Sequence, residues 1–234
     1  MNCAAFCDSA LNSTPRALAK IPTGYPCSCA LHGYPVGILA NARGVLFSAE
    51  SQKAAQFIQL ANQSGTPLLF LHNTTGYMVG KDYEQGGIIK HGAMMINAVA
   101  NSGVPHISVL LGASYGAGHY GMCGRAYDPR FVFTWPSARS SIMGAKQLAD
   151  VTSMVAKASA LSQGKPFDED ANAILRAAIE NQIEAESMPM FLSGYLYDDG
   201  VIDPRDTRTI LGLSLSAIHN APVKGTQSFG IFRM

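Results

Sequence analysis

Charged residues are scarce in this chain. They make up 14% of its 234 residues, and 17 Lys and Arg nearly balance 16 Asp and Glu. No long basic run is present, so the electrostatic footprint of a nucleic-acid-binding protein is missing. Long apolar runs are missing as well, because stretches such as TPLLFL and HISVLLGA are far too short to span a bilayer. We therefore expect neither a nucleic acid nor a membrane as a partner.

The cysteines support neither a disulfide framework nor a metal site. They are odd in number, with no C-x-x-C repeat and no matching histidine spacing. The first residues also lack the basic and then apolar order of a secretory signal. The sequence thus predicts no metal ligands and a reducing compartment. The five cysteines are Cys3, Cys7, Cys27, Cys29 and Cys123.

Familiar side-chain catalysts are missing too. No serine stands in a G-x-S-x-G elbow, and no His, Cys and Asp set is suggested by spacing. If the chain takes part in catalysis, the chemistry would therefore rest on main-chain donors.

What the sequence does contain is an alternation of short apolar runs with helical patterns. Ala54, Phe57, Ile58 and Ala61 recur at helical spacing, as expected for an amphipathic helix. The apolar runs have strand length and little internal polarity, which is typical of buried parallel strands. Together they predict an α/β fold built from βαβ crossovers. The expected strands are 34–40, 66–73, 105–113, 130–136 and 140–144.

After residue 145 the pattern predicts helices only. We expect three of them, over 145–163, 168–187 and 206–220, with Asp168 and Asp206 as N-caps. The stretch QGKPF separates the first two. Residues 1–30 fit this picture poorly, because three prolines interrupt any helix or central strand.

The stretch LLGASYGAGHYGMCGRAY, residues 110–127, places four glycines directly after an expected core strand. A strand, a glycine turn and a helix expose backbone N–H groups that have no internal partner. Two such groups form an oxyanion hole in many enzymes. No Gly-Lys-Ser/Thr follows, and GASYGAG does not have the G-x-G-x-x-G spacing, so we expect neither a phosphate loop nor a dinucleotide site.

A second turn of this kind is HNTTGYMVG, residues 72–80, which leaves another expected strand at Gly76. Ligands of open α/β folds bind at the carboxyl ends of the strands, and both turns are predicted to lie there. The glycines could equally serve tight packing or plain turns.

Residues 70–144 and the tail YLYDDGVIDPRDTRTILGLSLSAI resemble the β (carboxyltransferase) subunit of biotin-dependent acyl-CoA carboxylases. The segment 73–80 is most similar to methylcrotonyl-CoA and geranyl-CoA carboxylases. The resemblance implies a crotonase-like superfold with a C-terminal helical part. It also implies transfer of a carboxyl group from carboxybiotin to the enolate of an unsaturated, branched acyl-CoA. Biotin would be carried in trans by a biotinylated α subunit, and no metal would be needed.

The resemblance also assigns residues to the site. Ala117 and Gly118 match the two amides that hold the biotin ureido oxygen, and the catalytic role falls to them. Tyr115 and Gly116 belong to the same turn and are expected to contact biotin. Thr75, Gly76 and Tyr77 are expected to form the second wall of the cleft.

Residues Gly33, Tyr34, Pro35, Val36 and Gly37 resemble the stretch that borders the acyl-CoA site in the family. The likeness runs over 32–234 and covers only the C-domain, so a neighbouring chain or a separate N-domain would have to complete the site. We expect an oligomer for this reason. Residues 1–31 form an atypical segment and a candidate for disorder, since Pro26 stands where the family has a strand.

Two other functions remain open. A truncated, non-catalytic copy would act only as an assembly module. A crotonase-fold hydratase or isomerase is disfavoured, because no paired glutamates stand near the glycine turns. The family implies the cytoplasm in a bacterium and the mitochondrial matrix in a eukaryote.

Three conspicuous features receive structural interpretations. His119 is expected to be a hydrogen-bonded structural residue rather than a biotin ligand, and Cys123 a small buried hydrophobe. The acidic stretch 198–208 is interpreted as turns.

Overall fold

A seven-stranded sheet forms the centre of the computed structural model, which describes residues 27–41 and 44–232. The strand order is β1-β2-β3-β4-β5-β7, and β6 pairs with the last residues of β4. The first two strands are an antiparallel hairpin, and all other pairs are parallel. The strands are β1 (Cys27–Leu31), β2 (Tyr34–Ala40), β3 (Leu68–Thr74), β4 (His106–Tyr115), β5 (Phe131–Thr134), β6 (Arg139–Ser141) and β7 (Gly200–Val201).

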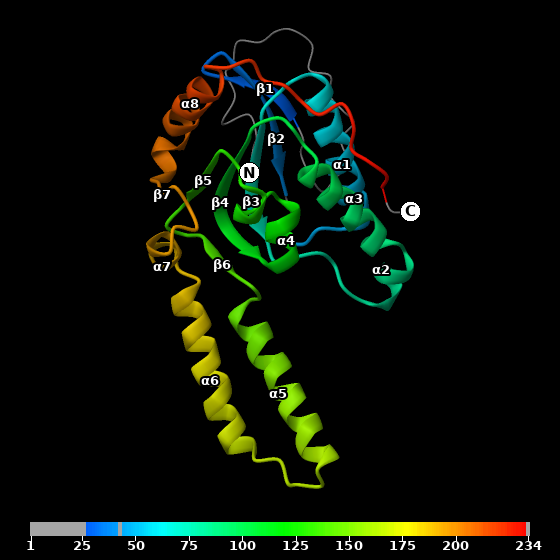
Figure 1. Cartoon of the computed structure of the whole chain (residues 1–234). Coiled ribbons are helices and arrows are strands. Elements are labelled where there is room, and N and C mark those ends of the chain that lie inside the picture. Colours follow the sequence, from blue (N-terminus) through cyan, green and yellow to red (C-terminus); the bar gives the residue numbers. More distant parts are fainter. Residues whose placement is uncertain (1–26, 42–43, 233–234) are drawn as a thin grey trace.

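Helices cover both faces of the sheet. Figure 1 shows α1 and α3 on one side and α8 on the other. The central strand β3 is buried on both faces, because Leu68 and Phe70 join one apolar cluster while Leu69 and Leu71 join the other. The helices are α1 (Ser48–Gln63), α2 (Lys81–Gln85), α3 (Ile88–Ala100), α4 (Gly116–Gly121), α5 (Ala145–Ser162), α6 (Glu169–Glu186), α7 (Pro189–Gly194) and α8 (Thr207–Ile218), with short 3₁₀ turns at Arg125–Tyr127 and Pro204–Asp206.

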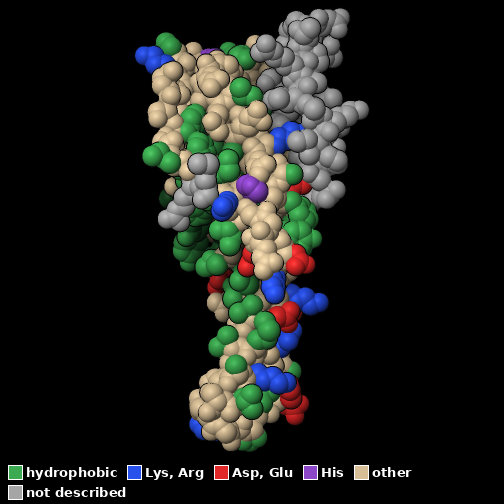
Figure 2. Space-filling model, turned by 90° about the vertical axis from the view of Figure 1, so that its right-hand side faces the viewer, with side chains coloured by type: hydrophobic (Ala, Val, Ile, Leu, Met, Phe, Trp, Pro, Cys, Tyr) green, Lys and Arg blue, Asp and Glu red, His purple; other side chains and the backbone are tan. Residues whose placement is uncertain are grey.

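Helices α5 and α6 form a hairpin that projects away from the sheet (Figure 1). Of its side chains, Ala149 alone is buried. Figure 2 shows the hairpin as a narrow extension on which hydrophobic side chains lie among charged ones. Its large exposed hydrophobics are Val151, Met154, Val155, Leu161, Ile174 and Leu175.

The predicted helices and the buried strands 34–40, 66–73, 105–113 and 130–136 are confirmed, with small shifts of their ends. The predicted strand 140–144 is only partly correct, because β6 covers Arg139–Ser141, is half-buried and ends before the exposed Ile142. Asp168 caps α6 as predicted, because its carboxylate accepts a hydrogen bond from the Ala171 N–H at 2.9 Å. Asp206 occupies the N-cap position of α8 but makes no capping hydrogen bond with its side chain. A 3₁₀ turn precedes α8 instead, and Asp203 caps that turn through the Arg205 N–H at 2.8 Å.

Three elements differ from the prediction. The strand that Pro26 placed in doubt exists as β1, which begins at Cys27 and pairs with β2 at the edge of the sheet. Residues 27–31 of the segment expected to be atypical are thus a strand, while residues 1–26 lie outside the described residues. The short helix α7 and the strand β7 were not predicted, so strands do not cease at residue 145. Both are too short to show periodicity.

Candidate functional site

The two glycine turns lie against each other at the carboxyl end of the parallel strands. The first follows β3 and the second follows β4, and these strands are neighbours in the sheet. A Cβ on Gly118 would lie 2.9 Å from both the Gly76 Cα and the Thr74 Cγ2. Only a hydrogen atom fits between the turns, so this glycine is required by close approach. The structure thus brings Gly76 and Gly118 together.

Gly116 turns the chain from β4 into α4. Its φ is +47°, and a Cβ there would lie 2.7 Å from the Ile142 carbonyl oxygen. An L side chain is therefore disfavoured on two counts, by backbone conformation and by space.

The turn presents two adjacent amides at the start of α4. Ala117 and Gly118 are the second and third residues of this helix, so their N–H groups have no acceptor within it, and no turn or loop carbonyl among the described residues accepts from them. Ala117 is exposed and Gly118 is buried against the neighbouring turn. Tyr115 is the N-cap residue and supplies no side-chain cap. An oxygen that carries developing negative charge would satisfy both amides.

The neighbouring turn is held rigidly by its own hydrogen bonds. Both the N–H and the hydroxyl of Thr75 donate to the Gly44 carbonyl, at 2.7 and 2.8 Å, and the Gly76 carbonyl accepts from the Leu46 N–H at 2.9 Å. Burial raises the pKa of Tyr77, whose hydroxyl lies 3.6 Å from the Met95 Sδ in the core. Their side chains serve the fold, so contact with a ligand would come from the backbone.

Residues Gly116 to Gly121 do have the G-x-G-x-x-G spacing, so spacing alone does not exclude a dinucleotide site. The structure argues against one, because α4 has only six residues. The last glycine is a packing contact as well: a Cβ on Gly121 would lie 2.1 Å from the Tyr77 hydroxyl oxygen.

The predicted acyl-CoA stretch lies at the other end of the sheet. Gly33 is part of the β1–β2 turn, and Gly37 pairs with Leu68 at the start of β3, level with His106 at the start of β4. Nine residues of β4 separate that level from Tyr115, about 30 Å of strand. Gly33, Tyr34, Pro35, Val36 and Gly37 are therefore not brought together with the glycine turns within one chain.

A cavity of about 600 Å³ opens beside α4, on the side of β6 rather than of β3. Its walls are mainly apolar, with a few polar groups, as in typical small-molecule sites. The sequence does not reveal this cavity, because its residues come from many helices and strands between Leu110 and Asp198. It is lined by Leu110, Gly116, His119, Tyr120, Arg125, Thr134, Ser140, Ser141, Ile142, Leu148, Ile183, Glu186, Phe191, Leu192, Tyr197 and Asp198.

Two neighbouring aspartates of the acidic stretch 198–208 differ in their contacts. Asp199 binds Arg125 at 3.2 Å and accepts from the Val132 N–H at 2.7 Å. Asp198 lines the cavity, is 6% exposed, and neither of its carboxylate oxygens has a partner among the described residues. The interpretation of residues 198–208 as turns alone is therefore incomplete.

These aspartates provide a stability test with opposite signs. An unpartnered buried carboxylate costs free energy, so Asp198→Asn should raise the free energy of unfolding by about 1–3 kcal/mol. Asp199→Asn, the matched control, should lower it by about 1 kcal/mol through loss of the ion pair. Urea unfolding at pH 7 measures both. Equal destabilisation by the two variants would show that Asp198 has a partner.

His119 is hydrogen-bonded as predicted, although it also lines the cavity, and the interpretation of Cys123 as a buried hydrophobe is confirmed. The His119 Nδ1 lies 2.8 Å from the Ser114 Oγ, and burial lowers the pKa of this imidazole to about 4. Cys123 is fully buried, and burial raises the pKa of its thiol to about 12, far from the lowered pKa of a nucleophile.

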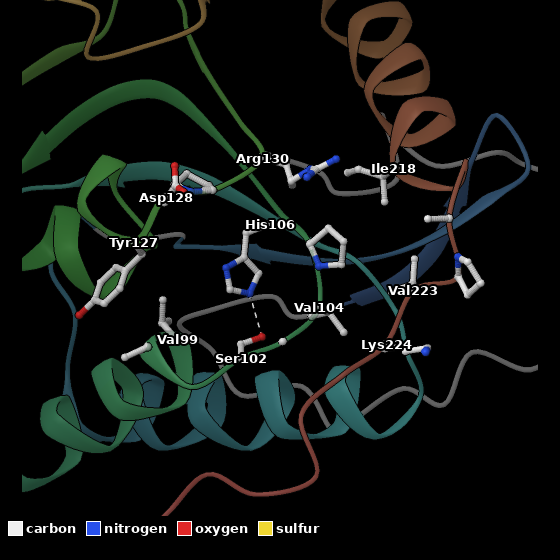
Figure 3. A pocket seen from close by; sticks show the side chains of 16 residues that line it. Val99, Ser102, Val104, His106, Tyr127, Asp128, Arg130, Ile218, Val223 and Lys224 are labelled. Atoms are coloured by element: carbon white, nitrogen blue, oxygen red, sulfur yellow. Dashed lines mark hydrogen bonds between the residues drawn. The ribbon is translucent and has the colours of Figure 1, made fainter.

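A second cavity, of about 470 Å³, lies at the amino end of β4 and is shown in Figure 3. His106 lines it, with its Nε2 2.8 Å from the Ser102 Oγ and its Nδ1 3.2 Å from the Cys123 Sγ. Both ring nitrogens are thus occupied, and burial lowers the pKa to about 4. This histidine supports the fold at the end of the sheet opposite to the glycine turns.

Within residues 27–41 and 44–232, no group of three or more His, Cys, Asp and Glu side chains is arranged to hold a metal ion. None of the helices described there is long and apolar enough to cross a membrane.

Comparison with known proteins identifies the family. Residues 28–231 match the model of the carboxyl transferase domain. The chain belongs to this family. It is 75% identical over 204 residues to a probable biotin-dependent acyl-coenzyme A carboxylase beta2 subunit of Mycobacterium tuberculosis, covering 87% of this chain and 39% of the relative. A biotin-dependent 3-methylcrotonyl-coenzyme A carboxylase beta1 subunit of that organism is 50% identical, over 87% of this chain and 38% of the relative.

Solved structures agree with this assignment. The β subunit of geranyl-CoA carboxylase from P. aeruginosa superimposes with a TM-score of 0.77 at 40% identity, covering 89% of this chain and 40% of that one. The predicted crotonase-like α/β fold is thereby confirmed. This carboxyl transferase domain spans about two fifths of the length of the relatives that it matches.

Proposed function

We propose that this chain supplies the biotin-binding half of a carboxyltransferase site. In the complete enzyme, the site would move a carboxyl group from carboxybiotin to the enolate of an unsaturated, branched acyl-CoA. The observation that carries the proposal is the pair of adjacent amides of Ala117 and Gly118, at the carboxyl end of β4 and beside an apolar cavity.

The residues present fit a biotin ureido group. Such a group has a carbonyl oxygen that gains negative charge when the carboxyl group leaves its ring nitrogen. Two adjacent N–H donors at a glycine turn would stabilise that charge, each contributing roughly 10²- to 10³-fold in rate. Gly116 and Gly118 carry no side chain that would keep a ligand from the backbone. Tyr115 and the Gly76 turn would flank the ligand, with Thr75 and Tyr77 acting through their backbone.

The chain's residues act here by position and not by proton transfer. His119, beside the turn, has a pKa of about 4, lowered by burial, and is neutral at pH 7. It is therefore unsuited to give or take a proton near neutrality. The low polarity of the cavity walls would exclude water and strengthen the amide–oxygen interaction.

The acyl-CoA, the biotin-carrying α subunit and an N-domain from elsewhere complete the proposed site. Relatives named for 3-methylcrotonyl-CoA and geranyl-CoA support the substrate class. A solved relative, a transcarboxylase 12S protein, is described as a hexamer, which supports an oligomer here. Residues Gly33 to Gly37 would border acyl-CoA only in such an assembly. The proposed compartment is the mitochondrial matrix in a eukaryote and the cytoplasm in a bacterium.

The test combines the chain with a carboxylated biotin carrier subunit and an N-domain taken from the 75% identical mycobacterial relative. We expect labelled carboxyl groups to reach 3-methylcrotonyl-CoA only when all three proteins are present. If the full-length relative transfers the label while the mixture does not, the catalytic proposal fails. The chain would then be an assembly module, the alternative function.

A further inference from the structure

The geometry points to a positioning role for His72, Ser114 and His119, a buried hydrogen-bonded chain that holds the turn carrying Ala117 and Gly118. The inference rests on the proposed function only in assigning a role to those two amides. The chain links β3, β4 and α4, and it ends on the backbone of the 3₁₀ turn that follows α4.

The direction of every hydrogen bond follows from one fixed donor. The Arg125 backbone N–H lies 3.3 Å from the His119 Nε2, and an amide can only donate. The His119 Nε2 must therefore accept and carry no proton. In a neutral imidazole the proton then sits on Nδ1, which donates to the Ser114 Oγ at 2.8 Å.

Ser114 passes the direction on to the second histidine. Its hydroxyl has a single proton, and the remaining neighbour is the His72 Nδ1 at 2.8 Å. The hydroxyl proton has a partner only if that nitrogen accepts, which places the proton of His72 on Nε2. This Nε2 has no hydrogen-bond partner. Interaction with the Met122 backbone raises the pKa of His72, against the larger lowering by burial.

These hydrogen-bond directions require both histidine side chains to be neutral. A proton on the His119 Nε2 would face the Arg125 N–H, and a proton on the His72 Nδ1 would face the Ser114 hydroxyl. Burial lowers the pKa of His119 to about 4, and burial, with a smaller contribution from the charge of His119, lowers the pKa of His72 well below 6.5. The neutral state and the hydrogen-bond directions therefore agree.

Two members of the hydrogen-bonded chain lie on either side of the turn in the sequence. Ser114 stands two residues before Gly116, and His119 directly follows Gly118. Both ends of the turn are thus tied to the same buried hydroxyl, across only five residues. Ser114 and His72 are themselves 0% exposed and fixed in paired strands. Loss of the hydroxyl should free the turn while the sheet stays intact.

Histidine ¹⁵N NMR of the 234-residue chain at pH 7 tests the hydrogen-bond directions. We expect His119 protonated on Nδ1 and His72 protonated on Nε2. Any other pair of tautomers, or a charged imidazole, would overturn the inference.

Backbone ¹⁵N relaxation tests the positioning role. Ser114→Ala should lower the order parameters of the Ala117 and Gly118 amides from about 0.85 to below about 0.6. The matched control is Ser108→Ala, which removes another fully buried hydroxyl of β4, one that donates to the Cys123 carbonyl at 2.6 Å. It should destabilise the fold by a similar amount and leave both order parameters near about 0.85. Equal order parameters in the two variants would show that the hydrogen-bonded chain does not position the turn.

A pair of replacements at His119 refines the assignment. The His119→Asn variant places an amide N–H near the position of Nδ1 and should retain a rigid turn, whereas His119→Phe should not. Adding biotin methyl ester separates this inference from the proposed function. If biotin shifts the amide signals of Ala117 and Gly118 but Ser114→Ala leaves their order parameters unchanged, the positioning role fails and the function stands. If the order parameters change as expected and biotin shifts neither signal, the function fails instead.

Discussion

Replacing Gly118 with valine should abolish carboxyl transfer in the assembled enzyme, with a loss of at least about 10³-fold. The added Cβ would meet the Gly76 Cα and the Thr74 Cγ2 at 2.9 Å, and backbone cannot yield as a flexible side chain can. The two glycine turns would separate, and the amides of Ala117 and Gly118 would leave their common direction. A loss of one oxyanion donor costs roughly 10²- to 10³-fold, and here both are displaced. Steady-state transfer to 3-methylcrotonyl-CoA measures the effect.

The control is Gly194→Val, at a glycine that has open space around its Cβ position and ordinary backbone angles. It should keep both the fold and the transfer rate. Circular dichroism would show whether Gly118→Val is folded, and Gly118→Ala, with a smaller side chain, serves if it is not. Transfer by a folded Gly118→Val variant within tenfold of the wild type would remove this turn from the proposed site.

Acid should destabilise the chain well before its carboxylates are protonated. Burial lowers the pKa of His106 and His119 from 6.5 to about 4 in the folded state. Below pH 6.5 the unfolded chain binds protons that the folded chain does not, so the free energy of unfolding falls as the pH falls from 6.5 towards 4. Each histidine should cost about 1.5 kcal/mol between pH 6.5 and pH 5. His72, whose pKa is lowered well below 6.5, adds to the loss.

Urea unfolding at pH 7, 6 and 5 measures this dependence. The His106→Gln variant should be less stable at pH 7. Between pH 6.5 and 5, its free energy of unfolding should depend on pH less steeply than that of the wild type, by the equivalent of about one bound proton. Ser137→Ala, on an exposed loop residue, should keep the full slope. A wild-type stability that is flat over this range would show that these imidazoles bind protons in the folded state.

The periodicity of apolar residues and the positions of glycine and proline predict this fold well, because its central strands are buried on both faces. The run 34–40 coincides with β2, and the run 105–113 lies within one or two residues of β4. The glycine turns could be found for a related reason. A turn that needs both a positive φ and a close backbone approach leaves few residues other than glycine at Gly116 and Gly118. The sequence reveals these turns because the constraint on the backbone acts on single residues.

What the sequence could not predict depends on contacts between distant segments. Asp198 looks like any turn aspartate, and only the placement of α7 and β7 reveals that it is buried without a partner beside the cavity. The chain of His72, Ser114 and His119 joins residues 42 and 5 positions apart, without a recognisable spacing. Proline is unfavourable in the interior of a strand, so the sequence argues against a strand around Pro26. The strand β1 begins only after this residue, at Cys27.

The contact between Gly76 and Gly118 also limits how this family can diversify. A side chain on Gly118 would meet the backbone of the neighbouring turn, whereas Gly76 has open space around its Cβ position but a φ of +140° that L side chains rarely adopt. Both positions are therefore restricted to glycine, for different reasons. The cavity wall built by β6, α6 and α7 carries ordinary side chains such as Ile142, Ile183 and Phe191, which can change size one at a time. A mutant library that varies this wall and leaves both glycine turns untouched should therefore change the shape of the cavity without disturbing the turns.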